Sequence, residues 1–173
     1  RAPRGPQRLG ELLSLLETHG QAASTAIFYT TDNGYHLGQF AIPLDKRQPY
    51  QTDVRLPLLV RGPGIAPGRV VTDGFVVTID LAPTFLDLAG AKMDPSKARQ
   101  LDGISQVQAL WYGAPAPRHA VLLQADSYGY RKDPLGFSFG GLVQDDWKLL
   151  VNVTHAGSCS PDSHQFKVSR KCY

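Results

Sequence analysis

The stretch Ile27–Thr31 constrains the fold most, because five β-branched or aromatic residues end abruptly at an acid and an amide, Asp32 and Asn33. Such a run favours a β-strand. Polar groups at the carboxyl end of a buried strand face the crevice where open α/β sheets bind ligands. Asp32 and Asn33 carry the hard oxygen atoms that Ca²⁺ and Mg²⁺ prefer. The pattern predicts an α/β protein, and from these residues alone both a metal site and a turn fit this strand end. The alternative is a simple Asp-Asn-Gly turn that hydrogen-bonds its own backbone.

The remaining hydrophobic pattern predicts helices and strands on both sides of this segment. The leucines of Leu9–Leu16 form one stripe of a helix that Gly20 would end and that would pack on the sheet. The apolar run Leu56–Val60 predicts a strand buried on both faces, as in a parallel sheet. Asp80 is placed to cap a helix over 81–88. A short helix is expected near 111, and strands are expected over 121–124, 139–143 and 147–151.

Four blocks of the sequence resemble the sulfatase family, and within it the branch that acts on 6-O-sulfated glucosamine. The blocks are TDNGYHLGQF, LDKRQPYQTDVRLPLLVRGPGI, TIDLAPTFLDLAG and LDGIS, and they lie in the family's order. The resemblance implies an α/β fold built on part of an alkaline-phosphatase-like sulfatase sheet with flanking helices. It assigns 1–113 to the carboxyl-terminal part of the catalytic domain and 114–173 to an incomplete, small antiparallel subdomain.

The resemblance also implies roles for individual residues. Asp32 and Asn33 would be calcium ligands, and Lys46 would contact the sulfate as a compact point charge. Without the resemblance, Lys46 is a solvated lysine in a charged run. His36 would donate a proton to the leaving oxygen or contact the sugar, and the alternative is a structural histidine. Gln124 stands where the family often has a glutamate, so a carboxylate contact to the amino sugar is in doubt and Gln124 is the candidate contact.

The nucleophile that the family uses has no counterpart in these 173 residues. It is a formylglycine made from cysteine in a Cys-x-Pro-Ser-Arg string, and neither Cys159 nor Cys172 lies in such a string. The sequence therefore predicts the carboxyl-terminal portion of a sulfatase, with the preceding part of the same protein as its partner. The isolated chain is expected to be inactive. A second hypothesis is a non-catalytic product that binds sulfated glycans weakly or packs against a partner.

Composition and short motifs set the expected surroundings. The formal net charge is only +3 and no basic cluster indicates nucleic acid, whereas a sulfated glycosaminoglycan fits the resemblance. No apolar run approaches the roughly 20 residues of a transmembrane helix. Asn152 begins an Asn-Val-Thr glycosylation acceptor. Together with the resemblance, this favours a lysosomal or secreted protein.

Overall fold

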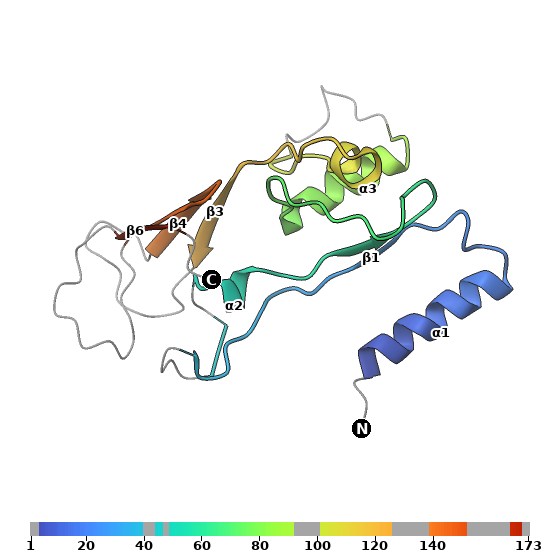
Figure 1. Cartoon of the computed structure of the whole chain (residues 1–173), viewed down its shortest axis with the longest axis horizontal. Coiled ribbons are helices and arrows are strands. Elements are labelled where there is room, and N and C mark those ends of the chain that lie inside the picture. Colours follow the sequence, from blue (N-terminus) through green and yellow to red (C-terminus); the bar gives the residue numbers. More distant parts are fainter. Residues whose placement is uncertain are drawn as a thin grey trace.

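The computed structural model describes residues 4–39, 44–46, 49–91, 101–125, 139–151 and 167–170. Two antiparallel sheets organise these residues, a two-stranded one in the order β1-β2 and a four-stranded one in the order β3-β4-β5-β6. Figure 1 shows the helix α3 near the first sheet and the helix α1 extending away from it. The described residues therefore form a mixed α/β structure.

The two-stranded sheet pairs β1 (Ile27–Tyr29) with β2 (Leu59–Arg61), and Phe28 lies opposite Val60. The prediction of a doubly buried strand over Leu56–Val60 was wrong in both extent and setting. Pro57 has no N–H to donate to a strand ladder, so pairing begins only after it. Strand β1 pairs with the edge of β2 and does not cover its face, so the Leu59 side chain is 59% exposed.

An aromatic cluster holds this sheet to the elements that follow it. The ring of Phe28 packs edge-on against Phe85 of α3 (Leu81–Leu88), with ring centroids 4.9 Å apart. It also lies 5.9 Å from Trp111 of η3 (Gln108–Tyr112), a turn of π-helix. Phe28 thus joins β1 to α3 and η3, and the Trp111 indole N–H donates to the carbonyl of Pro63, just after β2, at 2.9 Å. Aromatic pairs of this geometry stabilise beyond the area that they bury.

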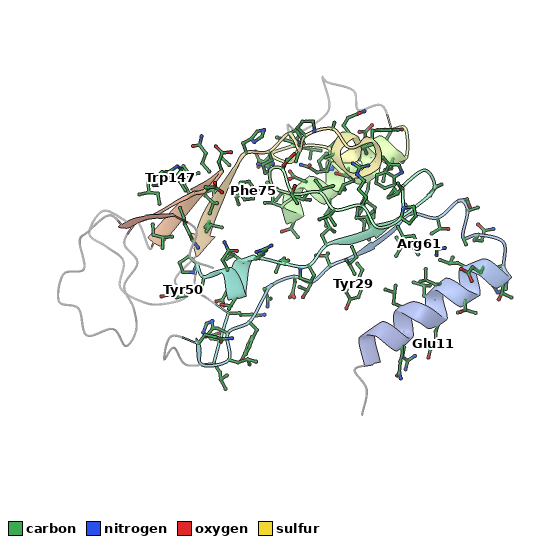
Figure 2. The ribbon with its side chains drawn as sticks, in the orientation of Figure 1. Glu11, Tyr29, Tyr50, Arg61, Phe75 and Trp147 are labelled. Atoms are coloured by element: carbon green, nitrogen blue, oxygen red, sulfur yellow. The ribbon has the colours of Figure 1, made fainter. Side chains whose placement is uncertain are left out.

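The predicted first helix is confirmed as α1 (Arg4–Thr18), and Gly20 follows it in the left-handed conformation with φ +66°. Its packing was not predicted correctly, since Leu12 is 45% and Leu15 57% exposed. Contact with the first sheet comes from a 3.6 Å ion pair between Arg61 and Glu17, and Figure 2 shows Arg61 on the side toward α1. None of the helices in the described ranges is long and apolar enough to cross a membrane.

The four-stranded sheet confirms the predicted carboxyl-terminal strands. It consists of β3 (Ala120–Ala125), β4 (Phe139–Gln144), β5 (Trp147–Val151) and β6 (Lys167–Arg170). Strands β4 and β5 form a tight hairpin in which Gln144 pairs with Trp147. Asp145 in its turn has a φ of +48°, which Asp tolerates better than most residues. A short α2 (Gln51–Val54) lies between β1 and β2, the two strands of the first sheet, in the sequence.

Candidate functional site

The strand end that the sequence singled out is exposed and partly satisfied by its own backbone. Asp32 follows β1 by three residues, and its Oδ1 accepts hydrogen bonds from the Asn33 backbone N–H at 2.9 Å and the Thr31 hydroxyl at 3.2 Å. The Asn33 side chain donates through Nδ2 to the carbonyl of Gly34 at 2.8 Å. These contacts form the local turn that was the alternative interpretation, and they leave the Asn33 Oδ1 directed to another partner.

That partner is Lys46, which lies 13 residues further along the chain. Its Nζ donates to the Asn33 Oδ1 at 2.8 Å on the exposed side of the site. An isolated antiparallel bridge between His36 and Asp45 brings the two segments together, with the His36 N–H donating to the Asp45 carbonyl at 3.0 Å. The Asp45 carboxylate also accepts from the Lys46 N–H at 2.8 Å. Asp32, Asn33 and Lys46 are thus brought to one place and form an exposed trio, in which Asn33 is half-buried.

The donor set fits a cation only in part. Asp32 and Asn33 offer adjacent hard oxygen atoms, but within the described ranges no group of three or more His, Cys, Asp or Glu residues is placed to hold a metal. Calcium takes six to eight oxygen ligands. Two ligands make a partial site, and the Asn33 oxygen already accepts a hydrogen bond from an ammonium group.

His36 lies in a different environment from Lys46. Its ring Nδ1 lies 2.8 Å and 2.9 Å from the two carboxylate oxygens of Asp53 in α2, and both side chains are 1% exposed. Among the described residues, the ring Nε2 has no hydrogen-bond partner. The Thr52 hydroxyl donates to Asp53 Oδ1 at 3.0 Å and helps to orient the carboxylate. The structure therefore places His36 in a buried pair beside the exposed trio.

Sequence reasoning did not single out Asp53 or Gly34, yet both determine how the site is built. The Gly34 N–H donates to the Asp53 carbonyl at 2.8 Å, and the Tyr35 N–H donates to the Thr52 carbonyl at 2.9 Å. A Cβ atom on Gly34 would lie 1.9 Å from the Thr52 carbonyl oxygen, so only glycine permits this approach. The Asp-Asn-Gly string included this glycine, but it indicated a turn and not the close approach of two backbone segments.

Two further features surround the site. The buried side chain of Lys148 in β5 donates through Nζ to the carbonyl of Pro49, which links the four-stranded sheet to the start of α2. A cavity of about 520 Å³ lies between Asp32, α2 and β3, and most of its lining is Val, Leu and Ile. Its wall is mostly apolar and its Arg118 is paired with Asp80, so Lys46, which does not line it, is the better candidate for binding an anion.

Asp80 has a role that differs from the predicted one. Helix α3 has the predicted bounds, but the Asp80 carboxylate makes no capping bond to it. Instead Arg118 binds this fully buried carboxylate, with Nη2 2.6 Å from Oδ1. The N–H groups of Val77 and Ile104 donate to it at 3.1 Å and 2.8 Å, and Gln106 Nε2 donates at 3.1 Å.

The pKa of Asp80 reflects this environment. Burial alone would raise the pKa of Asp80, but the donors from Arg118, Ile104 and Val77 outweigh it and hold the pKa below its usual range. The same ion pair raises the pKa of Arg118. The donor that fixes the Asp80 carboxylate is Arg118, 38 residues away in the sequence. A pattern of neighbouring residues therefore did not predict this contact.

The other predicted residues lie in or beyond β3. Gln124 is in β3, where its backbone pairs with Gly140 of β4. Asn152, Cys159 and Cys172 lie outside the described residues.

Comparison with known proteins matches the same part of the chain. Residues 7–91 match the family model described as "Sulfatase". The N-acetylglucosamine-6-sulfatase of Bos taurus is 50% identical over 95 residues, which are 55% of this chain and 16% of that protein. The extracellular sulfatase SULF-1 homolog of Drosophila melanogaster is 51% identical over 75 residues, or 43% and 7% of the two chains. The chain thus spans less than a fifth of these relatives.

A solved structure also resembles this one along most of the chain. It is that of a protein in complex with its substrate, D-glucosamine-2-N,6-O-disulfate. The TM-score is 0.74 with 27% sequence identity, and the match covers 95% of this chain and 31% of the other.

Proposed function

Because residues 7–91 belong to the sulfatase family, we propose that this chain is part of a sulfuric ester hydrolase that removes 6-O-sulfate from N-acetylglucosamine or glucosamine residues. The substrate would be a sulfated glycosaminoglycan, heparan or keratan sulfate. The relatives named N-acetylglucosamine-6-sulfatase and the solved complex with a 6-O-sulfated glucosamine support this choice. The family and the extracellular relative support a lysosomal or secreted location.

One observation carries the proposal, the 2.8 Å contact of Lys46 Nζ with Asn33 Oδ1 beside the exposed Asp32. A sulfate ester needs positive charge at its oxygen atoms, and a compact ammonium group is a suitable donor to such an anion. When bound, calcium would supply further positive charge, with Asp32 and Asn33 as two of its ligands. Lys46 would hold a sulfate oxygen and stabilise charge that develops on it. Gln124 is proposed as a contact to the sugar.

A second candidate is a non-catalytic product that binds sulfated glycans. It applies to these 173 residues taken by themselves, because they contain no Cys-x-Pro-Ser-Arg string and so no nucleophile for the lysine and metal to assist. We expect the purified chain to give no hydrolysis of 4-methylumbelliferyl sulfate above a matched blank. Turnover that EDTA removes would contradict this expectation.

A chimera tests the proposal directly. In the bovine N-acetylglucosamine-6-sulfatase, the matched segment is replaced by that of this chain, and release of 6-O-sulfate from N-acetylglucosamine-6-sulfate is measured. Lys46→Ala should lower the rate on the order of 100-fold, as loss of a charge-stabilising donor does. Lys46→Arg should restore only part of it, because a planar guanidinium does not replace a point charge.

The matched control is Arg61→Ala, which removes an exposed cation of β2 that pairs with Glu17. It should leave the rate within about twofold of the parent, as exposed ion pairs contribute little. A near-parental rate for Lys46→Ala would remove this lysine from the site. A folded parental chimera without activity would also count against the proposal.

A further inference from the structure

The buried pair of His36 and Asp53 lies directly behind the exposed trio. One ring nitrogen meets both carboxylate oxygens, at 2.8 Å and 2.9 Å, and both side chains are withdrawn from water. A carboxylate accepts hydrogen bonds and donates none, so His36 Nδ1 is the donor in this contact. Nδ1 thus faces the carboxylate, and Nε2 is left without a partner among the described residues.

The pair belongs to a set of contacts that joins the segment 34–36 to α2 and to Asp45. Three successive backbone N–H groups, those of Gly34, Tyr35 and His36, donate across to the carbonyls of Asp53, Thr52 and Asp45. The His36 side chain adds a fourth connection in the same direction. Asn33 and Lys46 each lie one residue outside this set, so its geometry determines where their side chains begin.

Lys46 needs this support because it is exposed. Holding a lysine side chain in one rotamer costs up to about 2 kcal/mol of conformational entropy, and exposed polar contacts return little of it. The 2.8 Å contact with Asn33 therefore depends on how closely the two backbone segments are held. A buried contact that fixes these segments raises the fraction of molecules in which the ammonium and the amide oxygen face each other.

We propose that Asp53 and His36 are positioning residues, which fix the Asn33–Lys46 arrangement through the Nδ1–carboxylate contact. This inference rests on the proposed function, because the Asn33–Lys46 arrangement has a use only if it is part of a sulfate and metal site. Its geometric content can be tested without turnover. Proton donation by His36 through Nε2 is the competing role, and it predicts a different set of variants that retain function.

The test uses two amide side chains that mimic the two ring nitrogens. In His36→Asn the side-chain N–H₂ stands near the position of Nδ1, whereas in His36→Gln it stands near Nε2. Hydrogen exchange of the Gly34 and Tyr35 amides is followed by NMR in the full 173-residue chain. His36→Gln and His36→Ala should speed this exchange at least about tenfold through local opening, and His36→Asn should stay within about threefold of the parent.

Asp53→Asn keeps the shape of the side chain and one acceptor but removes the charge, so it should give an intermediate increase. Thr84→Ala is the control for general destabilisation, because Thr84 is buried in α3 and hydrogen-bonds Asp80 and Gln106 away from the site. It should not speed exchange at Gly34 and Tyr35 selectively. Equal loss of protection in His36→Asn and His36→Gln, or a parental chain without protection at these amides, would overturn the proposal.

The chimera provides the functional arm. Positioning predicts that His36→Asn keeps most of the sulfatase rate while His36→Gln loses it, whereas proton donation predicts that both fall as far as His36→Ala. An equal fall of all three would overturn the positioning role. If exchange follows the predicted pattern and Lys46→Ala leaves the chimera fully active, the proposed function fails but the structural contact stands.

Discussion

Two aspartates near the ends of apolar runs, Asp32 and Asp80, have opposite surroundings. Asp32 is exposed, and the donors to its carboxylate come from neighbouring residues, the Asn33 N–H and the Thr31 hydroxyl. Asp80 is fully buried and takes donors from Arg118, Val77, Ile104 and Gln106. A carboxylate whose acceptor positions are filled by distant parts of the chain supports the fold. One with only local donors retains capacity for a ligand.

The largest effect on stability is expected from replacing Asp80, the buried aspartate of this comparison. Asp80→Ala leaves the largely buried Arg118 side chain without its ion-pair partner and removes the acceptor for two backbone N–H groups. We expect the free energy of unfolding to fall by about 3–5 kcal/mol, as when one partner of a buried ion pair is removed. Urea unfolding followed by circular dichroism measures it. The exposed Asp73→Ala should change stability by less than about 0.5 kcal/mol, and a similar small value for Asp80→Ala would contradict the distinction.

The pH dependence of stability tests the same group in a second way. The folded pKa of Asp80 lies below its ordinary value of 3.8, so its carboxylate stabilises the folded state above that pH. The stabilisation is lost as pH falls below 3.8 through the folded value, where Asp80 takes up a proton in both states. The difference in unfolding free energy between the parent and Asp80→Asn should stay constant from pH 7 to about 5 and narrow below about 4. A difference that is largest at low pH would contradict the cause assigned to the shift.

The sequence predicted elements better than it predicted contacts. Helix 81–88 and strands 121–124, 139–143 and 147–151 are confirmed, because each depends on local periodicity and on turn residues such as Gly90. The prediction of a strand over 56–60 was wrong in extent and setting, because an apolar run does not specify which strand it pairs with. The cap role of Asp80 was wrong because Arg118, 38 residues away, provides the donor that fixes the carboxylate.

The fold class was predictable because the family resemblance supplied what local pattern does not. The match to solved sulfatase-like structures confirms the alkaline-phosphatase-like α/β assignment. In the candidate site, the resemblance pointed to Asp32, Asn33 and Lys46, and the fold brings them together. It did not point to Asp53, because its contact with His36 depends on a helix of only four residues, for which the sequence carries no periodic signal.

A calcium response tests the exposed member of the comparison. We expect the isolated chain to bind Ca²⁺ only at millimolar levels, because it offers few of the six to eight oxygen ligands. With a Kd of about 1 mM, 10 mM calcium would raise the free energy of unfolding by about 1.4 kcal/mol. Asp32→Ala should abolish this increase while leaving stability without calcium nearly unchanged. A large loss of stability without calcium would instead make Asp32 a structural residue like Asp80.

The smallest expected effect concerns Lys46, which competes with the metal that it would assist. Its ammonium group donates to the same Asn33 oxygen that is proposed as a calcium ligand, so a bound divalent cation meets a like charge within a few ångströms. At an exposed site this repulsion is on the order of 1 kcal/mol before salt screens it. Lys46→Gln should therefore tighten calcium binding about threefold in low salt, with the gain shrinking at high ionic strength. No such competition concerns Arg118, because the Asp80 carboxylate that it binds is buried and is not a proposed calcium ligand.

Isothermal titration of the parent and of Lys46→Gln with calcium at two salt concentrations measures this effect, and Arg61→Gln controls for net charge. The control removes one cation from β2 without touching the site, so its calcium affinity should match that of the parent. Weaker calcium binding in Lys46→Gln would mean that the lysine holds Asn33 in the ligating orientation. This orientation would then favour calcium binding by more than the repulsion between the ammonium group and calcium opposes it. Tighter binding there, together with loss of sulfatase rate in the Lys46→Ala chimera, would separate the two tasks of the exposed site: Asp32 and Asn33 hold the metal, and Lys46 holds the anion.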